Sequence, residues 1–154
     1  MQVALSALDP KFKYEVANHP GGENIKYCFA CGVCTAGCPV SEIDDRYNPR
    51  QIIRKILLGM REEVLGSDTI WLCISCNTCT AHCPQNVKFS DVMGALRAMA
   101  VDQGYVHKSF EAKVRVLDKL AQEIRRKLVM AVVDQRQHDF ALDPDKLVQQ
   151  VLAK

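Results

Sequence analysis

All eight cysteines of this 154-residue chain fall in two short runs that share one spacing. Residues 28–39 read CFACGVCTAGCP and residues 73–84 read CISCNTCTAHCP, so both follow the pattern C-x2-C-x2-C-x3-C-P. This pattern is typical of loops that bind [4Fe–4S] clusters in two-cluster ferredoxins. Three thiolates with two residues between them can converge on three irons of one cluster, while the fourth, next to proline, is directed elsewhere. The spacing therefore predicts two [4Fe–4S] clusters.

In such ferredoxins the fourth cysteine of each run ligates the other cluster. By that rule the first cluster is held by Cys28, Cys31, Cys34 and Cys83. The second cluster is held by the reciprocal set, Cys73, Cys76, Cys79 and Cys38. Crossed ligation would tie the two halves of the chain together and bring the clusters close enough to exchange electrons. Because metal binding is coupled to folding, we expect the centre of the chain to unfold when the clusters are removed.

A pair of zinc sites with four cysteines each is the alternative. Zinc sites usually combine two C-x2-C knuckles and do not need a third cysteine two residues further on, so iron–sulfur clusters are favoured. With every cysteine used as a ligand, no iron is left open for a substrate. A glycine-rich nucleotide-binding loop is also missing. We therefore expect a non-catalytic electron-transfer protein.

The composition narrows the class of partner and the compartment. A net charge of +2, with basic and acidic residues interspersed, gives no reason to expect nucleic acid as a partner. No segment is apolar for the roughly 18 to 20 residues that a membrane span needs, and the N-terminus does not read as a secretory signal. We expect a cytoplasmic protein, in which cysteines bind metal more readily than they form disulfides.

Helices are expected to position the two cysteine loops, and strand patterns are almost absent, so the fold is predicted to be all-α. Residues 49–65 carry apolar side chains at helical spacing. Asn48 can cap this helix, Pro49 suits its first turn, and Gly66 is placed to end it. A second short helix is expected over residues 67–72, leading into the second loop.

Three more helices are expected after the second loop. Ser90 can cap one that stops at Gly104, and residues 109–133 read as a longer amphipathic helix. Asp143 and Pro144 start a last short helix that reaches the C-terminus. The apolar run VMAVV at 129–133 is either buried or an exposed contact for a partner, and the sequence favours neither.

The cysteine motif is the only internal repeat, and its two copies superpose without a gap. Thr35 with Thr80 and Pro39 with Pro84 match alongside the cysteines. Duplication of a cluster loop explains this repeat better than a solenoid, which needs at least three copies.

Beyond the cysteines, three connected pieces of the sequence resemble the C subunit of heterodisulfide reductase. They are GGENIKYCFACGVCTAGCP at 21–39, NPRQIIRKILLGMREEVLGSDTIWLCISCNTCTAHCPQNV at 48–87, and the helix through MAVDQGY. The resemblance covers roughly residues 12–106. It implies an α-helical ferredoxin fold with two cluster-binding loops, in which the eight motif cysteines are the cluster ligands.

The resemblance also implies a role and an organisation. In that family the C subunit relays electrons between the flavin-containing A subunit and the disulfide-reducing, catalytic B subunit of a hetero-oligomeric complex. We expect an N-terminal lead-in over residues 1–24, a dicluster domain over 25–105, and a C-terminal helical extension over 106–154 that binds a partner. Two other functions stay open. A free dicluster ferredoxin would usually have a strongly acidic surface, and a structural or regulatory metal protein would not cycle reversibly in a redox titration.

Overall fold

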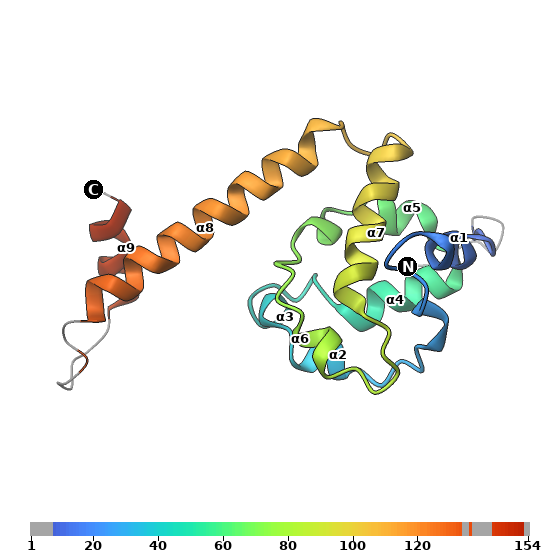
Figure 1. The fold of residues 1–154 in the computed structure, drawn as a ribbon, viewed down its shortest axis with the longest axis horizontal. Helices are drawn as coiled ribbons and strands as arrows, with labels where there is room; N and C mark the ends of the chain where they lie inside the picture. Colours follow the sequence, from blue (N-terminus) through green and yellow to red (C-terminus); the bar gives the residue numbers. More distant parts are fainter. Residues whose placement is uncertain (1–7, 134–135, 137–142, 153–154) are drawn as a thin grey trace. The chain divides into compact units, whose positions relative to one another are not determined.

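The computed structural model of the chain describes residues 8–133, 136 and 143–152. Within these ranges the chain is helical and contains no strand (Figure 1). It divides into two compact units between Lys108 and Ser109. The helices of the first unit are α1 (Phe12–Asn18), α2 (Val33–Ala36), α3 (Pro39–Ile43), α4 (Pro49–Leu58), α5 (Arg61–Leu65), α6 (Thr78–Ala81) and α7 (Phe89–Asp102). Two 3-10 turns, Ile25–Tyr27 and Asp68–Trp71, lead into the two cysteine runs.

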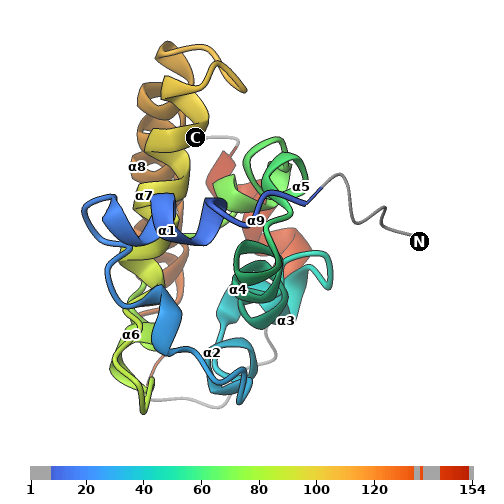
Figure 2. The same ribbon diagram turned by 90° about the vertical axis from the view of Figure 1, so that its right-hand side faces the viewer.

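The core of the first unit is built from α1, α4, α5 and α7, which contact one another. Its fully buried side chains are mostly aliphatic and include Phe12, Val16, Ile25, Ile56, Val64, Leu65, Ile70, Val92, Met93 and Leu96. The two shortest helices, α2 and α6, lie side by side at the opposite end of the unit from α5, as both views show (Figures 1 and 2). The cysteine loops are therefore gathered at one end of a helical core.

Helix α1 lies in the segment for which the sequence predicts only a polar lead-in. The Phe12 ring is fully buried, and the Arg61 guanidinium lies over it at 4.8 Å from the ring centroid. Arg61 also pairs with Asp9 at 2.7 Å and with Glu15 at 2.6 Å. These contacts with α5 make α1 part of the core. Residues 1–7 of the predicted lead-in are outside the described residues.

The single helix predicted over residues 49–65 is wrong in one respect, because the structure breaks it at Gly59. Asn48 caps α4 as expected and accepts a hydrogen bond from the Gln51 N–H at 3.1 Å. Gly59 then takes φ +81°, and its carbonyl accepts a hydrogen bond from the Asp9 N–H at 2.8 Å. This close backbone approach joins the start of the chain to the α4–α5 turn, and no local pattern reveals it.

The start of α7 also differs from the prediction that Ser90 caps it. The helix begins at Phe89, and Lys88 precedes it with φ +54°. The Ser90 hydroxyl is instead hydrogen-bonded to the Thr80 hydroxyl at 2.6 Å, so it serves the second cysteine loop. The predicted stop is confirmed, since α7 ends at Asp102 and Gly104 follows with φ +78°.

The second unit consists of α8 (Ser109–Val133) and α9 (Pro144–Leu152), which contact each other. The bounds of α8 are those predicted, and none of its side chains is buried. In the run at 129–133, Val129 and Met130 are exposed. The end of the last predicted helix, residues 153–154, is outside the described residues. Within the described part of the chain, no helix combines the length and the apolar character that crossing a bilayer requires.

Candidate metal centres

The repeated cysteine pattern folds into a repeated backbone. Helices α2 and α6 occupy equivalent positions in the two runs. Each helix follows a residue in the left-handed region, Gly32 with φ 89° in the first loop and Asn77 with φ 62° in the second. Glycine and asparagine are the residue types that tolerate this conformation best. The two loops are therefore structural copies and not only sequence copies.

A second pair of equivalent residues turns backbone N–H groups toward sulfur. Ala30 and Ser75 have φ of 58° and 53°, which costs an ordinary residue about 1–2 kcal/mol. The Ala30 N–H donates to Cys28 Sγ and the Ser75 N–H donates to Cys73 Sγ, each at 3.4 Å. Hydrogen bonds to ligand sulfurs are among the features that set the potential of a cluster. The strained residues thus orient donors that suit ligand thiolates.

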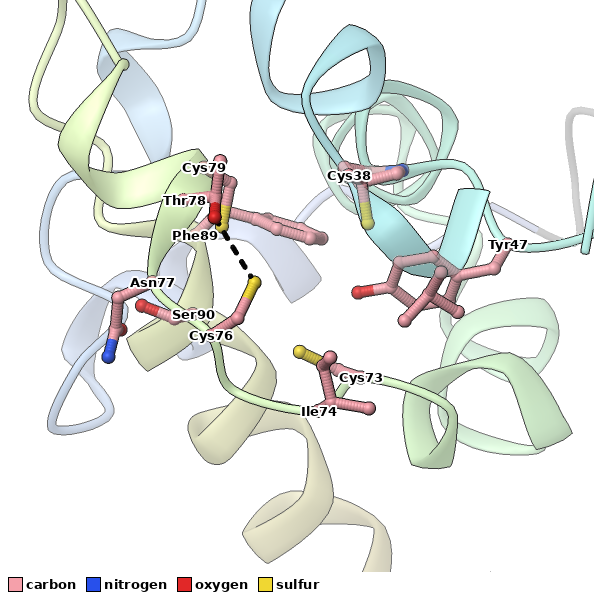
Figure 3. Close-up of a pocket in the computed structure, with 12 residues that line it drawn as sticks. Cys38, Tyr47, Cys73, Ile74, Cys76, Asn77, Thr78, Cys79, Phe89 and Ser90 are labelled. Carbon is pink, nitrogen blue, oxygen red and sulfur yellow. Dashed lines mark hydrogen bonds between the residues drawn. The ribbon is translucent and has the colours of Figure 1, made fainter. Parts of the chain in front are cut away.

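One cavity gathers the four cysteines predicted to hold the second cluster. It has a volume of about 320 Å³ and is lined by Cys38, Cys73, Cys76 and Cys79 together with Val40, Tyr47, Pro49, Ile74, Asn77, Thr78, Phe89 and Ser90. Figure 3 shows the four sulfurs facing a common space. Cys38 reaches it from the start of α3 and the other three cysteines from the second loop. The cavity therefore combines residues from both runs, as crossed ligation requires.

A second cavity of similar volume, about 370 Å³, gathers the other predicted set. It is lined by Cys28, Cys31, Cys34 and Cys83, with Ala30, Gly32, Val33, Arg50, Ile53, Cys79, Pro84, Val87 and Phe89. Cys79 and Phe89 line both cavities, so the two sites are adjacent. Similar size and the same number of contributed thiols suit two copies of one cofactor.

The sulfurs surround the cavity in Figure 3 and do not meet at one point. Accordingly, within the described residues no three His, Cys, Asp or Glu side chains form a group that could hold a single metal ion. Each cysteine ligand of a [4Fe–4S] cluster binds a different iron, so its ligands stand around the cofactor. The arrangement fits a cluster in each cavity.

The threonines matched in the repeat connect each loop to the helix that follows it. The Thr35 hydroxyl donates to Asn48 Oδ1 at 3.0 Å and accepts from the Arg50 N–H at 3.0 Å, at the start of α4. In the second loop the Thr80 hydroxyl bonds to the Ser90 hydroxyl in the first turn of α7. These bonds place the N-terminus of a long helix, with its positive end of the helix dipole, beside each cavity.

Arg97 on α7 anchors the entry to the second loop. Its Nε donates to the carbonyl of Ile70 at 2.8 Å and its terminal nitrogen donates to the carbonyl of Cys73 at 2.6 Å. Its guanidinium also lies 5.7 Å from the centroid of the Trp71 ring. Sequence reasoning did not identify this residue. The available signal was a single arginine inside the otherwise apolar stretch VMGALRAMA.

The cysteines differ in exposure and in acidity. Cys73 is buried, while Cys31 and Cys76 are exposed. Burial raises the pKa of the Cys79 thiol to about 11 and also raises the pKa of Cys34. A hydrogen bond between Cys76 Sγ and the Thr78 hydroxyl, 3.4 Å long, lowers the pKa of Cys76. Since a metal ligand must be the thiolate, iron binding at the buried positions releases protons.

Two other residues complete the surroundings. Tyr47, which sequence reasoning also missed, is 1% exposed and lines the second cavity. Burial, together with the sulfurs of Cys73 and Cys38, raises the pKa of Tyr47 well above its usual range, so the phenol stays protonated. His82, expected to face solvent, is exposed, with its Nδ1 3.1 Å from the carbonyl oxygen of Thr78.

Comparison with known proteins agrees with this geometry. Residues 24–87 match the model of a family described as the 4Fe-4S dicluster domain. That segment includes both cysteine runs and the helices α4 and α5 between them. Together with the eight cysteines in two cavities, the match establishes two [4Fe–4S] clusters as the cofactors of this chain.

Curated relatives share most of the first unit. The chain is 36% identical over 105 residues to the C subunit of the H2:CoB-CoM heterodisulfide, ferredoxin reductase of Methanothermobacter marburgensis, covering 68% of this chain and 56% of that protein. It is 43% identical over 82 residues to the iron-sulfur C 2 subunit of the CoB–CoM heterodisulfide reductase of Methanocaldococcus jannaschii, covering 53% and 43%. It is 41% identical over 86 residues to the iron-sulfur C subunit of the corresponding reductase of Methanopyrus kandleri, covering 56% and 44%.

The chain therefore spans about half the length of the curated relatives it matches. Over that half it keeps the dicluster domain, the helical fold and the ligand spacing, which together support an electron-transfer role. The chain is a helical dicluster iron–sulfur protein, homologous to the C subunits of heterodisulfide reductases.

Proposed function

We propose that this chain relays electrons between two partners in a heterodisulfide reductase-like complex, one that contains flavin and one that reduces a disulfide. The observation that carries the proposal is the pair of adjacent cysteine-lined cavities, which share Cys79 and Phe89. Two clusters at neighbouring positions can pass an electron from one to the other. The printed names of the relatives, which are C subunits of reductases, supply the kind of complex.

The ligand sets of the proposal are the crossed ones. Cys28, Cys31, Cys34 and Cys83 hold the first cluster, and Cys73, Cys76, Cys79 and Cys38 hold the second. The support is that each set lines one cavity, with Cys79 alone lining both. A cluster in each cavity supplies reversible one-electron chemistry, while the protein residues orient the thiolates and exclude water.

Electron entry and exit need a place where each cluster comes close to the surface. Cys31 and Cys76, at equivalent positions of the two loops, are the exposed cysteines. Each has an exposed apolar neighbour, Phe29 at 59% and Ile74 at 55%, also at equivalent positions. A relay with one partner at each cluster would use two such surfaces, whereas a cluster with only a structural role would not need them.

Anaerobic purification tests the relay. The tagged chain, expressed from its own genomic context, should co-purify with a flavin-containing protein and with a protein of the disulfide-reducing type. Both clusters should then be reduced when the flavin partner is reduced, as followed by EPR. A stable holo-monomer without partners would favour a free ferredoxin, and clusters that do not cycle reversibly would favour a structural role.

A pair of serine variants tests the crossed ligation. Cys38→Ser should damage the second cluster, although Cys38 belongs to the first run, and Cys83→Ser should damage the first cluster. Cys34→Ser is the matched control, because it should damage the first cluster under either crossed or uncrossed ligation. Loss of only the first cluster in Cys38→Ser would contradict the crossed sets. EPR of the reduced variants, together with their iron content, gives the readout.

The second unit is proposed to bind a partner. Its helix α8 has no buried side chain, and its exposed apolar residues include Val116, Leu117, Leu120, Val129 and Met130. Replacing Leu117 and Leu120 by Asp should reduce co-purification of a partner and leave the cluster content unchanged. The control exchanges the exposed polar residues Lys113 and Lys119 for Gln. Equal co-purification of both variants would contradict this role.

A further inference from the structure

The second cluster's cavity contains a phenol that the cluster ligands do not account for. Tyr47 lies between α3 and α4 and is almost completely buried. Its backbone is fixed on both sides, since its N–H donates to the Asp44 carbonyl at 2.9 Å and its carbonyl accepts from the Ser41 hydroxyl at 2.8 Å. Figure 3 shows the ring entering the cavity with its oxygen directed between Cys38 and Cys73.

A tyrosine in this position costs free energy unless its hydroxyl finds a partner. A phenylalanine would fill the same volume without burying an oxygen, and a buried hydroxyl without a hydrogen bond costs about 1–3 kcal/mol. The groups in front of the oxygen are the sulfurs of the second ligand set. A phenol O–H is a good donor, and a thiolate or cluster sulfur that carries negative charge is an acceptor.

We propose that the Tyr47 hydroxyl donates a hydrogen bond to a sulfur of the second [4Fe–4S] cluster and thereby raises its reduction potential. The proposal depends on the crossed ligand set given above. Reduction adds one electron, and part of the added negative charge resides on the sulfurs. A fixed donor stabilises that reduced state more than the oxidised one, so the cluster becomes easier to reduce.

The cavity of the first cluster provides an internal reference for this effect. Its lining contains no tyrosine, serine or threonine and is mainly apolar, with Ile53, Val87 and Phe89. Its one charged residue, Arg50, is exposed, so solvent screens its charge. The hydroxyl of Tyr47 therefore acts on one cluster of the two, and its removal should shift one potential and leave the other in place.

Tyr47→Phe tests the inference by an anaerobic redox titration of the holo-protein, monitored by EPR. We expect both clusters to assemble and the potential of the second cluster to fall. A roughly tenfold change in the reduction equilibrium corresponds to about 59 mV for one electron. The matched control is Tyr105→Phe, which removes a hydroxyl that donates to Glu62 at 2.7 Å outside both cavities and should shift neither potential.

Unchanged potentials in a fully loaded Tyr47→Phe protein would overturn the inference, and so would an equal shift of both clusters. If the variant does not assemble both clusters, hyperfine spectroscopy of the wild-type protein in H2O and D2O decides. We expect an exchangeable proton strongly coupled to the reduced second cluster, beyond the backbone N–H couplings that both clusters share. Its absence would overturn the inference. Failure of the ligand sets appears separately, as loss of the wrong cluster in Cys38→Ser.

Discussion

Arg97 should control how firmly the second cluster is held, because it fixes the chain at the entry of the second loop. The residue is partly buried and donates to two backbone carbonyls, those of Ile70 and Cys73. Arg97→Met removes both hydrogen bonds but keeps an apolar stem of similar length, so the packing of α7 changes little. The carbonyl of the first ligand of the loop then loses its anchor.

The size of the effect follows from the number and type of bonds. A hydrogen bond to a charged group contributes about 1.5–3 kcal/mol. Since partial exposure lets water replace part of that interaction, we expect a total loss of about 2–4 kcal/mol for the two bonds. If iron leaves through local opening of the loop, the second cluster should be lost roughly thirtyfold faster or more, because about 1.4 kcal/mol corresponds to a factor of ten.

An anaerobic chelator challenge measures this directly. The loss of each cluster is followed by absorbance and by EPR of reduced samples taken over time. Arg97→Lys should lie between the wild-type and Arg97→Met proteins, since an ammonium cannot reproduce the planar geometry that reaches both carbonyls. Arg54→Met, at an exposed position of α4, is the control and should match the wild type. Equal rates for Arg97→Met and Arg54→Met, or earlier loss of the first cluster, would refute the reasoning.

Other substitutions probe the scaffold and the loop anchors. Gly59→Ala should destabilise the first unit by about 2–4 kcal/mol, because φ is +81° and a Cβ would stand 2.2 Å from the Asp9 carbonyl oxygen. Gly94→Ala in mid-α7, with no atom within 4 Å of the added Cβ, should be neutral or stabilising by up to about 1 kcal/mol. Chemical denaturation monitored by circular dichroism compares them, and equal stability would contradict the close approach. Thr35→Val should accelerate chelation of the first cluster and Thr80→Val that of the second, each by a few-fold, and the same cluster being affected in both variants would count against two independent anchors.

The metal centres were predictable because they depend on local spacing. Eight cysteines in two identical patterns identify the cofactor, and the resemblance of the intervening helix identifies the helical fold. The repeat also predicted that Thr35 and Thr80 are equivalent, and the structure shows each of them joined to the start of the next long helix. What depends on neighbours in the chain was therefore accessible from the sequence.

The remaining features depend on contacts between distant segments. The break at Gly59 follows from its approach to Asp9, fifty positions earlier in the sequence, and Ser90 is drawn away from a capping role by Thr80. Tyr47 and Arg97 acquire their roles only when the second loop folds against α3, α4 and α7. Single residues of ordinary type, placed by tertiary structure, leave no periodic pattern in the sequence.

Iron and acid-labile sulfide analysis of the anaerobically purified chain, combined with an EPR redox titration, tests the account most directly. Each [4Fe–4S] cluster contains four irons and four sulfides, so two clusters give about eight of each per chain. We predict these amounts, together with two reversible one-electron steps and a magnetic interaction between the reduced clusters in their adjacent cavities. Bound zinc without sulfide, or a single reducible cluster in a fully loaded chain, would contradict it.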